Sequence, residues 1–236
     1  MKDYLLLVLE DERAHASESP RATAALIEQR SAFIEELRRT GQLKDSGRLR
    51  PSKEGYRVRR TSADVETESG PFGAERVALG AYYYVEAASL DAAAQLAESC
   101  PTLASDELDV RPVMKGRLAA DKDQKPGKIF ACGVLGNAPN ERAWVEVMDR
   151  IDAHKDSFPP GAMLGGVRLD PPKTGKRVAT RGGTRGVFDG PFLESKEVIG
   201  GLFFLRLASV DDVLRWASGV HFVEHGALEI RELWRS

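Results

Sequence analysis

The chain repeats itself, and an internal repeat limits the folds open to a sequence more than any other feature. A shift of 120 positions aligns residues 41–101 with 161–221 without a gap, and sixteen of these 61 positions are identical. The same offset returns near the end of each half, where Leu108–Arg111 meets Leu228–Arg231. The chain is therefore interpreted as two copies of one unit.

A polar stretch separates the two copies. Residues 118–127 hold several charged side chains and end in Pro126-Gly127, a composition typical of a linker. The predicted organisation is one domain over 1–117, a linker over 118–127 and a second domain over 128–236.

Each copy shows the same order of patterns. Short apolar runs predict strands, and apolar residues at helical spacing predict amphipathic helices that begin near a proline. Ser89 and Ser209 resemble N-caps of a second helix in each copy. The βαββαβ order indicates a ferredoxin-like α+β fold. The main predicted elements are strands over Tyr4–Leu9, Ile129–Leu135, Leu79–Ala87 and Ile199–Leu207, helices over Pro20–Thr40 and Pro139–Phe158, and a hairpin turn at Gly182-Gly183.

One strand of each copy is bulky and largely apolar on both faces. Tyr82 and Tyr84 point away from Tyr83 and Val85, yet none of the four is strongly polar. A sheet with one face in water should instead alternate apolar with polar residues. We therefore expect the two sheets of the chain to pack face to face as an intrachain dimeric α/β barrel.

Composition excludes several classes of protein. The net charge is −2, and the sequence has no basic stripe of the kind that binds nucleic acid. No apolar run is long enough to span a bilayer. Cys100 and Cys132 lie far apart, in no spacing typical of a disulfide framework or a zinc site. We expect a cytoplasmic protein without a cofactor or metal, which does not bind nucleic acid or membranes.

The segment after residue 186 closely resembles the signature of the YCII-related, or DGPF, family. The resemblance rests on Asp189-Gly190-Pro191-Phe192, on Glu194–Gly201, and on Glu107–Val113, which resembles the family's final strand. It covers essentially the whole chain, with one family domain in each half. It implies a dimeric α/β barrel with a cleft between paired sheets. Some members resemble enzymes that act on small, often aromatic, molecules through a His–Asp pair. The genes of DGPF members often lie beside genes for extracytoplasmic-function sigma factors, which suggests, by family analogy alone, a functional link to a sigma factor.

This chain departs from the family pattern at two points. In the enzymatic branch a histidine lies 11 residues before the glycine that ends the first helix, and the corresponding residues here are Arg30 and Arg150. The first copy also has Ser69 in place of the motif aspartate. The family's His–Asp mechanism is therefore not transferred to this chain.

Asp189 is the main candidate for catalysis, with His154 as its possible partner. Asp189 lies close to apolar Phe188 and Phe192, where a carboxylate could have a raised pKa and act as a general base. A tight Asp-Gly-Pro turn is the favoured interpretation, because the first copy keeps Gly-Pro-Phe without the acid. His154 lies on the apolar face of its helix, where a locally satisfied histidine is the alternative. His15 lies in an N-terminal loop without a visible partner, and the spacing of His221 and His225 is only weakly indicative of a metal.

Arginines and aromatic residues form the second group of candidates, for ligand binding. Arg48 and Arg168 occupy equivalent strands and could together bind a carboxylate or phenolate, or could be ordinary solvated arginines. The full set predicted to bind a ligand is Arg48, Arg168, Arg150, Phe192, Tyr82 and Tyr84.

Two functions remain open from the sequence. In the first, the chain binds a small organic ligand in the cleft, such as an aromatic molecule or a carboxylate, and has a regulatory or accessory role. In the second, it is a lyase, isomerase or oxygenase that uses Asp189 in the second copy. The chain is expected to be a pseudo-dimer in itself, and a further homodimer is possible.

Overall fold

The computed structural model describes residues 1–60, 64–72, 77–118, 125–136, 158–190, 198–219 and 226–234. The chain forms two compact units, each assembled from several segments. The first unit comprises Met1–Arg48, Ala74–Val113 and Pro172–Phe192. The second comprises Leu49–Gly73, Met114–Pro171 and Leu193–Ser236. Each unit is an antiparallel sheet with helices, so the predicted α+β class is confirmed.

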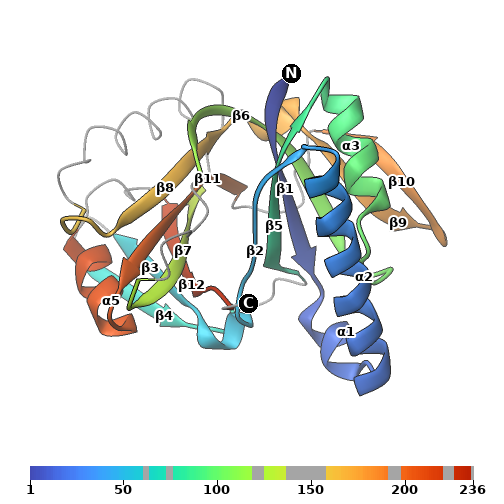
Figure 1. Ribbon diagram of the computed structural model, residues 1–236. Coiled ribbons are helices and arrows are strands. Elements are labelled where there is room, and N and C mark those ends of the chain that lie inside the picture. Colours follow the sequence, from blue (N-terminus) through green and yellow to red (C-terminus); the bar gives the residue numbers. More distant parts are fainter. Residues whose placement is uncertain are drawn as a thin grey trace. The chain divides into compact units, whose positions relative to one another are not determined.

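The first unit has the ferredoxin-like strand order β2-β5-β1-β6. Its helices α2 and α3 lie on the same face of the sheet (Figure 1). The predicted helix at Pro20 and the N-cap at Ser89 are both confirmed, since Ser89 Oγ accepts a hydrogen bond from the backbone N–H of Ala92 at 3.1 Å. The elements are β1 (Lys2–Glu10), α1 (Glu12–Ser17), α2 (Pro20–Arg39), β2 (Leu43–Arg48), β5 (Ala78–Ala87), α3 (Leu90–Ser99) and β6 (Glu107–Arg117).

The second unit repeats this order as β8-β11-β7-β12. Ser209 caps its helix as predicted, because its Oγ accepts a hydrogen bond from the backbone N–H of Asp212 at 3.2 Å. The predicted helix over Pro139–Phe158 lies outside the described residues except for Phe158. The described elements are β7 (Lys128–Gly136), β8 (Met163–Leu169), β11 (Val198–Leu207), α5 (Val210–Gly219) and β12 (Gly226–Glu232).

Each unit also contains a hairpin that comes from the other sequence copy. The hairpin of the first copy, β3 (Tyr56–Arg60) with β4 (Val65–Ser69), pairs with β12 in the second unit. The hairpin of the second copy, β9 (Lys176–Arg181) with β10 (Thr184–Asp189), pairs with β6 in the first unit. The compact units therefore differ from the sequence copies by an exchange of hairpins, which the repeat did not predict. A short 3-10 turn precedes each hairpin, at Ser52–Glu54 and Pro172–Thr174.

The exchange has the same register in both units. Leu108 and Asp109 of β6 face Val178 and Arg177 of β9. At positions 120 residues away in each strand, Leu228 and Glu229 of β12 face Val58 and Arg57 of β3. The repeat in the sequence thus corresponds to a repeat in strand pairing.

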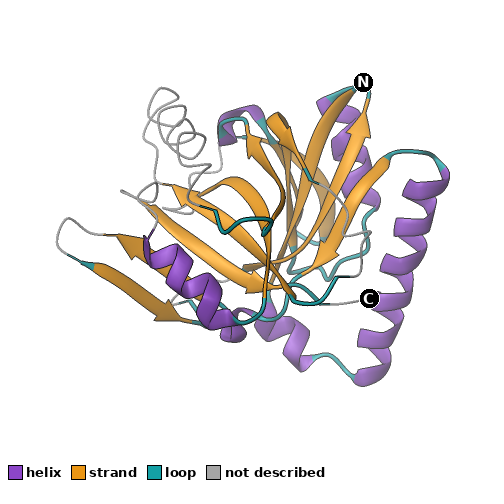
Figure 2. Ribbon diagram, turned by 60° about the vertical axis from the view of Figure 1, so that its left-hand side comes forward, coloured by secondary structure: helices purple, strands orange, loops and turns teal. Residues whose placement is uncertain are grey.

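Each sheet buries an apolar core beneath its helices. In the first unit Tyr83 and Val85 of β5 pack with Leu37 of α2 and with the alanines of α3, so a layer of helices covers a layer of strands (Figure 2). The residues of the central strands that point the other way are also buried: Tyr82 and Tyr84 are 2 and 1 % exposed. The prediction that both faces of this strand are buried is confirmed, and Leu202 and Phe204 of β11 repeat it at 1 and 3 %.

Candidate functional site

Asp189, the main catalytic candidate from the sequence, lies in an exposed place. It ends β10, and its side chain is 82 % exposed. Within the described residues its carboxylate accepts a hydrogen bond from Lys176 Nζ alone, at 2.6 Å. The carboxylate is therefore solvated and paired with an ammonium group, rather than enclosed by the apolar residues beside it in the sequence. The other motif candidates, His154, Arg150 and Phe192, lie outside the described residues.

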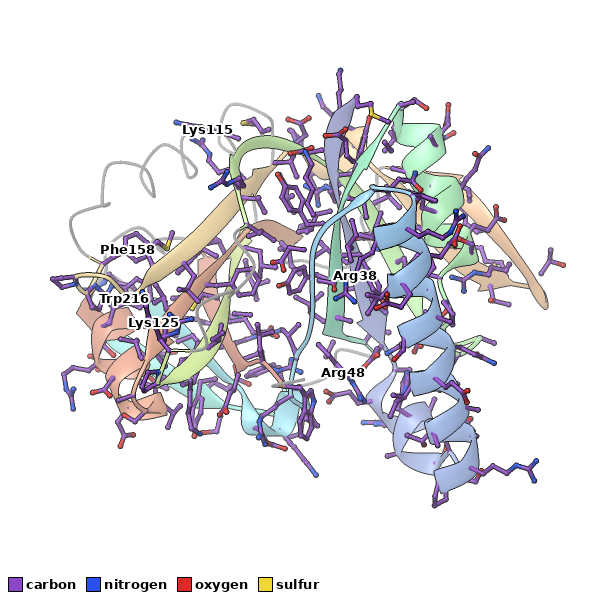
Figure 3. The ribbon with its side chains drawn as sticks, viewed as in Figure 1. Arg38, Arg48, Lys115, Lys125, Phe158 and Trp216 are labelled. Atoms are coloured by element: carbon purple, nitrogen blue, oxygen red, sulfur yellow. The ribbon has the colours of Figure 1, made fainter. Side chains whose placement is uncertain are left out.

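The ligand-binding candidates of the first unit are engaged by their own sheet. The Tyr82 hydroxyl donates to Asp45 Oδ2 at 3.0 Å, and the Tyr84 hydroxyl donates to Asp3 Oδ2 at 2.5 Å. Burial, and then the charge of Asp45, raises the pKa of Tyr82 well above its ordinary value, so the phenol stays protonated. Arg48 is exposed at the end of β2 (Figure 3), while Arg168 on β8 is half-buried.

A histidine–aspartate pair lies in the first unit instead. Nε2 of His15 lies 3.0 Å from Oδ1 and 2.9 Å from Oδ2 of Asp106. The Asp106 side chain is fully buried and that of His15 is 20 % exposed. The expected loop position of His15, without a partner, is wrong: His15 lies on α1, and its partner precedes β6 by one residue.

Asp106 is held in place by the backbone on both sides. Its Oδ1 accepts the N–H of Asp11 at 3.1 Å, and its Oδ2 accepts the N–H of Leu103 at 2.9 Å. Hydrogen bonds from N–H groups stabilise the charged form of a buried carboxylate. Asp11 also caps α1, since its side chain accepts from the N–H groups of Arg13 and Ala14. The cap therefore places His15 directly over Asp106.

A buried ion pair lies beside this histidine–aspartate pair. Arg30 of α2 donates from Nη1 to Glu10 Oε1 at 2.5 Å and from Nε to the carbonyl of Pro101 at 3.0 Å. Its Nη2 lies 3.8 Å from Asp106 Oδ2 and has no hydrogen-bond partner among the described residues. We call Glu10, His15, Arg30 and Asp106 the His15 cluster.

The arginine found at the family's histidine position is thus part of this cluster. The Arg30 side chain is only 9 % exposed, which is rare for an arginine unless it is paired. Gly80 of β5 leaves the space that Glu10 occupies, because a Cβ on Gly80 would lie 2.1 Å from Glu10 Oε2. The histidine that stands near Arg30 comes from α1 rather than from α2.

The charges of the cluster favour a protonated histidine. The hydrogen bond with Asp106 raises the pKa of His15 above its ordinary value, and the charge of Glu10 adds to this. Burial and the charge of Arg30 act in the opposite direction. Cys100 and Tyr83 lie close to Arg30, and burial raises the pKa of the Cys100 thiol to about 11. That thiol is protonated at neutral pH and is therefore a poor nucleophile.

The second copy has no charged side chain at the corresponding sheet positions. Gly226 occupies the place of Asp106, and Phe203 that of Tyr83, by the 120-residue offset. Strand pairing places Gly136 at the position of Glu10. In the second unit Phe203 instead meets Phe158 and Trp216, with ring centroids 5.5 and 5.8 Å away. Phe158 and Trp216 stack on each other (Figure 3). At the described sheet positions, the first copy therefore has Glu10, Asp106 and Tyr83 where the second has Gly136, Gly226 and Phe203.

A signal for the cluster was present in the sequence. Glu10 and Asp106 are acidic residues at adjacent ends of two strands that a ferredoxin-like sheet places side by side. Such a pair of carboxylates at a buried edge requires a cation, which Arg30 supplies. In the described part of the chain, no group of three or more His, Cys, Asp or Glu side chains is arranged to hold a metal ion. Among the described helices, none is both long and apolar enough to cross a membrane.

Comparison with known proteins identifies one family. The family model of the YCII-related domain matches residues 4–117 and again residues 121–236. No curated protein matches the chain. A crystal structure provisionally described as a chlorite dismutase is similar to the whole chain, with 11 % identity, a TM-score of 0.43 and coverage of 100 % of this chain and 96 % of its own. A likeness at this level carries no argument about activity.

Proposed function

The chain belongs to the YCII-related family in two tandem copies, and on this premise we propose that it binds a small organic anion at the His15 cluster. The proposed role is regulatory or accessory, as the sequence favoured. The ligand is a small carboxylate, aromatic or not, and its site lies in the first copy rather than at the Asp189 turn.

One observation carries this proposal. Asp106 holds Nε2 of His15, while Nδ1 has no hydrogen-bond partner among the described residues and the ring is partly exposed. Because the pKa of His15 is raised, the protonated ring is favoured and its Nδ1–H is available to an anion. The buried charge of Arg30 adds to the attraction without itself reaching solvent.

An enzyme of the acid–base type is the second candidate. A buried carboxylate that holds one ring nitrogen of a histidine leaves the other nitrogen as a general base, and this arrangement is common in enzymes. In this case the neutral form of His15 would act, and Asp106 would orient it. The two candidates use the same residues but opposite protonation states of the histidine.

The pH dependence separates the two candidates. We expect binding of benzoate or pyruvate, measured by calorimetry, to be strongest below the raised pKa of His15. Affinity should then fall by about tenfold per pH unit above it, the slope expected when one bound proton is required. A general base would instead give a rate that rises with pH through the same range.

Variants locate the site. His15→Gln and Asp106→Asn should abolish binding and its pH dependence, whereas Asp189→Asn, at the motif turn, serves as the control and should bind as the parent protein does. Loss of binding in Asp189→Asn, with unchanged binding in His15→Gln, would place the site at the turn instead. The absence of binding for aromatic and keto acids at any pH would contradict the proposal.

A further inference from the structure

Arg185, on the exchanged hairpin, makes an unusual set of contacts for a strand arginine. Its guanidinium donates from Nε to the carbonyl of Glu98 at 3.0 Å and from Nη2 to the carbonyls of Ala97 and Cys100 at 3.2 Å each. Its Nη1 donates to Thr102 Oγ1 at 2.7 Å. One side chain of the second copy thus binds both the end of α3 and the segment that follows it.

That segment leads directly to the His15 cluster. It runs from the end of α3 to the start of β6, and its next carbonyl, that of Pro101, accepts Nε of Arg30. Leu103 follows, and its N–H donates to the carboxylate of Asp106. Asp106 N–H returns a hydrogen bond to the carbonyl of Leu103 at 3.1 Å. The segment is therefore held by Arg185 on one side and by the cluster on the other.

The other hairpin shows what the same fold does without a cluster. The counterpart of Arg185 in β4, by the 120-residue offset, is Val65, which packs against the apolar core of the second unit. The counterpart of Asp106 is Gly226. The arginine and the aspartate are thus both present in the first unit, and both are replaced in the second.

A purely structural role for Arg185 is the alternative. In the second unit Arg60 of β3 donates from Nη2 to the carbonyl of Ser218 near the end of α5, at 2.7 Å. Such a contact stabilises a helix end by satisfying a free carbonyl. Arg185 does the same for α3, but it also reaches Cys100 and Thr102, beyond the helix.

We propose that Arg185 is a positioning residue of the His15 site, so that the hairpin of the second copy completes the site of the first. By fixing residues 100–102, Arg185 sets the position of the Leu103 N–H, which in turn orients Asp106 beneath His15. This inference rests on the proposed function for its consequence, the binding of an anion. The geometry it predicts at His15 is independent of any ligand.

The test is the titration of His15 in the full chain, followed by NMR with labelled histidine and assigned with His15→Gln. The charged groups that face His15 are Asp106 before β6, Glu10 of β1 and Arg30 of α2. Arg185→Ala should shift the titration midpoint of His15 down, toward the value of about 6.5 for a free histidine, because Asp106 is no longer held. Arg185→Lys should give a smaller shift, since one ammonium cannot bind four acceptors.

Arg60→Ala is the matched control. It removes a guanidinium from a helix end in the second unit, so it should lower the melting temperature without shifting His15. If Arg185→Ala lowers the melting temperature and leaves the His15 midpoint unchanged, the role is structural and the inference is overturned. Should Arg185→Ala not fold, Arg185→Lys provides the same readout, and an unchanged midpoint there again overturns it.

Ligand binding separates this inference from the proposed function. If both hold, Arg185→Ala should weaken benzoate or pyruvate binding by about tenfold. This is the effect of weakening one hydrogen bond to an ion, here the bond from His15 Nδ1–H to the ligand's carboxylate. A shifted His15 midpoint in a protein that binds neither acid supports the positioning role and rejects the proposed function. Intact binding with a shifted midpoint likewise supports the positioning role and rejects the proposed function, because binding would then not depend on the protonation of His15.

Discussion

Two aspartates of this chain show how burial decides what a carboxylate can do. Asp189 belongs to the sequence motif, but its side chain is 82 % exposed and is paired with Lys176. Asp106 belongs to no motif, yet it is fully buried, accepts two backbone N–H groups and holds His15. A fixed, desolvated carboxylate can orient and charge a histidine, whereas a solvated one is largely screened.

At the residue scale, substitution of Asp189 should have a small effect. Asp189→Asn and Asp189→Ala should both fold with a loss of less than about 1 kcal/mol, because the ion pair with Lys176 that both remove is exposed. Ala should be the less stable of the two, since Asn keeps a side-chain acceptor in the turn. Urea unfolding of the two variants measures this difference. A melting temperature that rises in Asp189→Asn would instead indicate an unfavourable buried charge at this position.

At the element scale, buried ion pairs join each exchanged hairpin to its sheet. Arg177 of β9 donates from Nε to Asp109 Oδ1 of β6 at 2.7 Å. In the second unit Arg57 of β3 donates from Nη2 to Glu229 Oε2 of β12 at 2.7 Å. Each pair lies where the two strands face each other in register. In both units the arginine is on the exchanged hairpin and the carboxylate is on the strand that receives it.

Removal of one partner of such a pair should be costly. Arg177→Ala leaves Asp109 buried without its cation, and we expect a loss of about 3 kcal/mol in the free energy of unfolding. The double variant Arg177→Met with Asp109→Leu should recover most of that loss, because neither charge of this pair remains buried. Arg39→Ala, in an exposed pair on α2, is the control. A single variant no less stable than this control would show that the pair does not hold the hairpin.

At the scale of the whole molecule, neither sequence copy should be a self-sufficient domain. A fragment of residues 1–118 keeps β6 but lacks β9 and β10, and its own β3 lacks β12. Open strand edges and bulky apolar faces favour association. We expect this fragment to form homodimers, in which the hairpin of each molecule pairs with β6 of the other molecule, or to aggregate. Light scattering after gel filtration measures this, and a well-behaved monomer would contradict both the exchange and the predicted sheet-to-sheet packing.

Local chemistry was sufficient to predict much of this fold from the sequence. Pro20 begins α2, Ser89 and Ser209 cap their helices, and Gly41 ends α2 with a φ of +71°, where glycine is favoured. The apolar run over residues 82–85 correctly predicted burial on both faces of β5. Each helix start and end depends on residues within one or two turns of each other, and the strand's burial follows from its own apolar residues, so these features could be predicted from the sequence alone.

Contacts between distant residues were decided only by the tertiary structure. His15 and Asp106 are 91 positions apart, and Arg177 and Asp109 are 68 positions apart. No periodicity or spacing connects such pairs, because strand pairing joins Arg177 to Asp109 and the placement of α1 brings His15 to Asp106. The repeat showed that the two copies are alike, but it could not show that they exchange hairpins, since a hairpin has the same local sequence whichever sheet it joins. The sequence thus determined the ends of the helices, the doubly buried strand and the family, while the tertiary structure decided which distant residues meet in the His15 cluster and which hairpin each sheet receives.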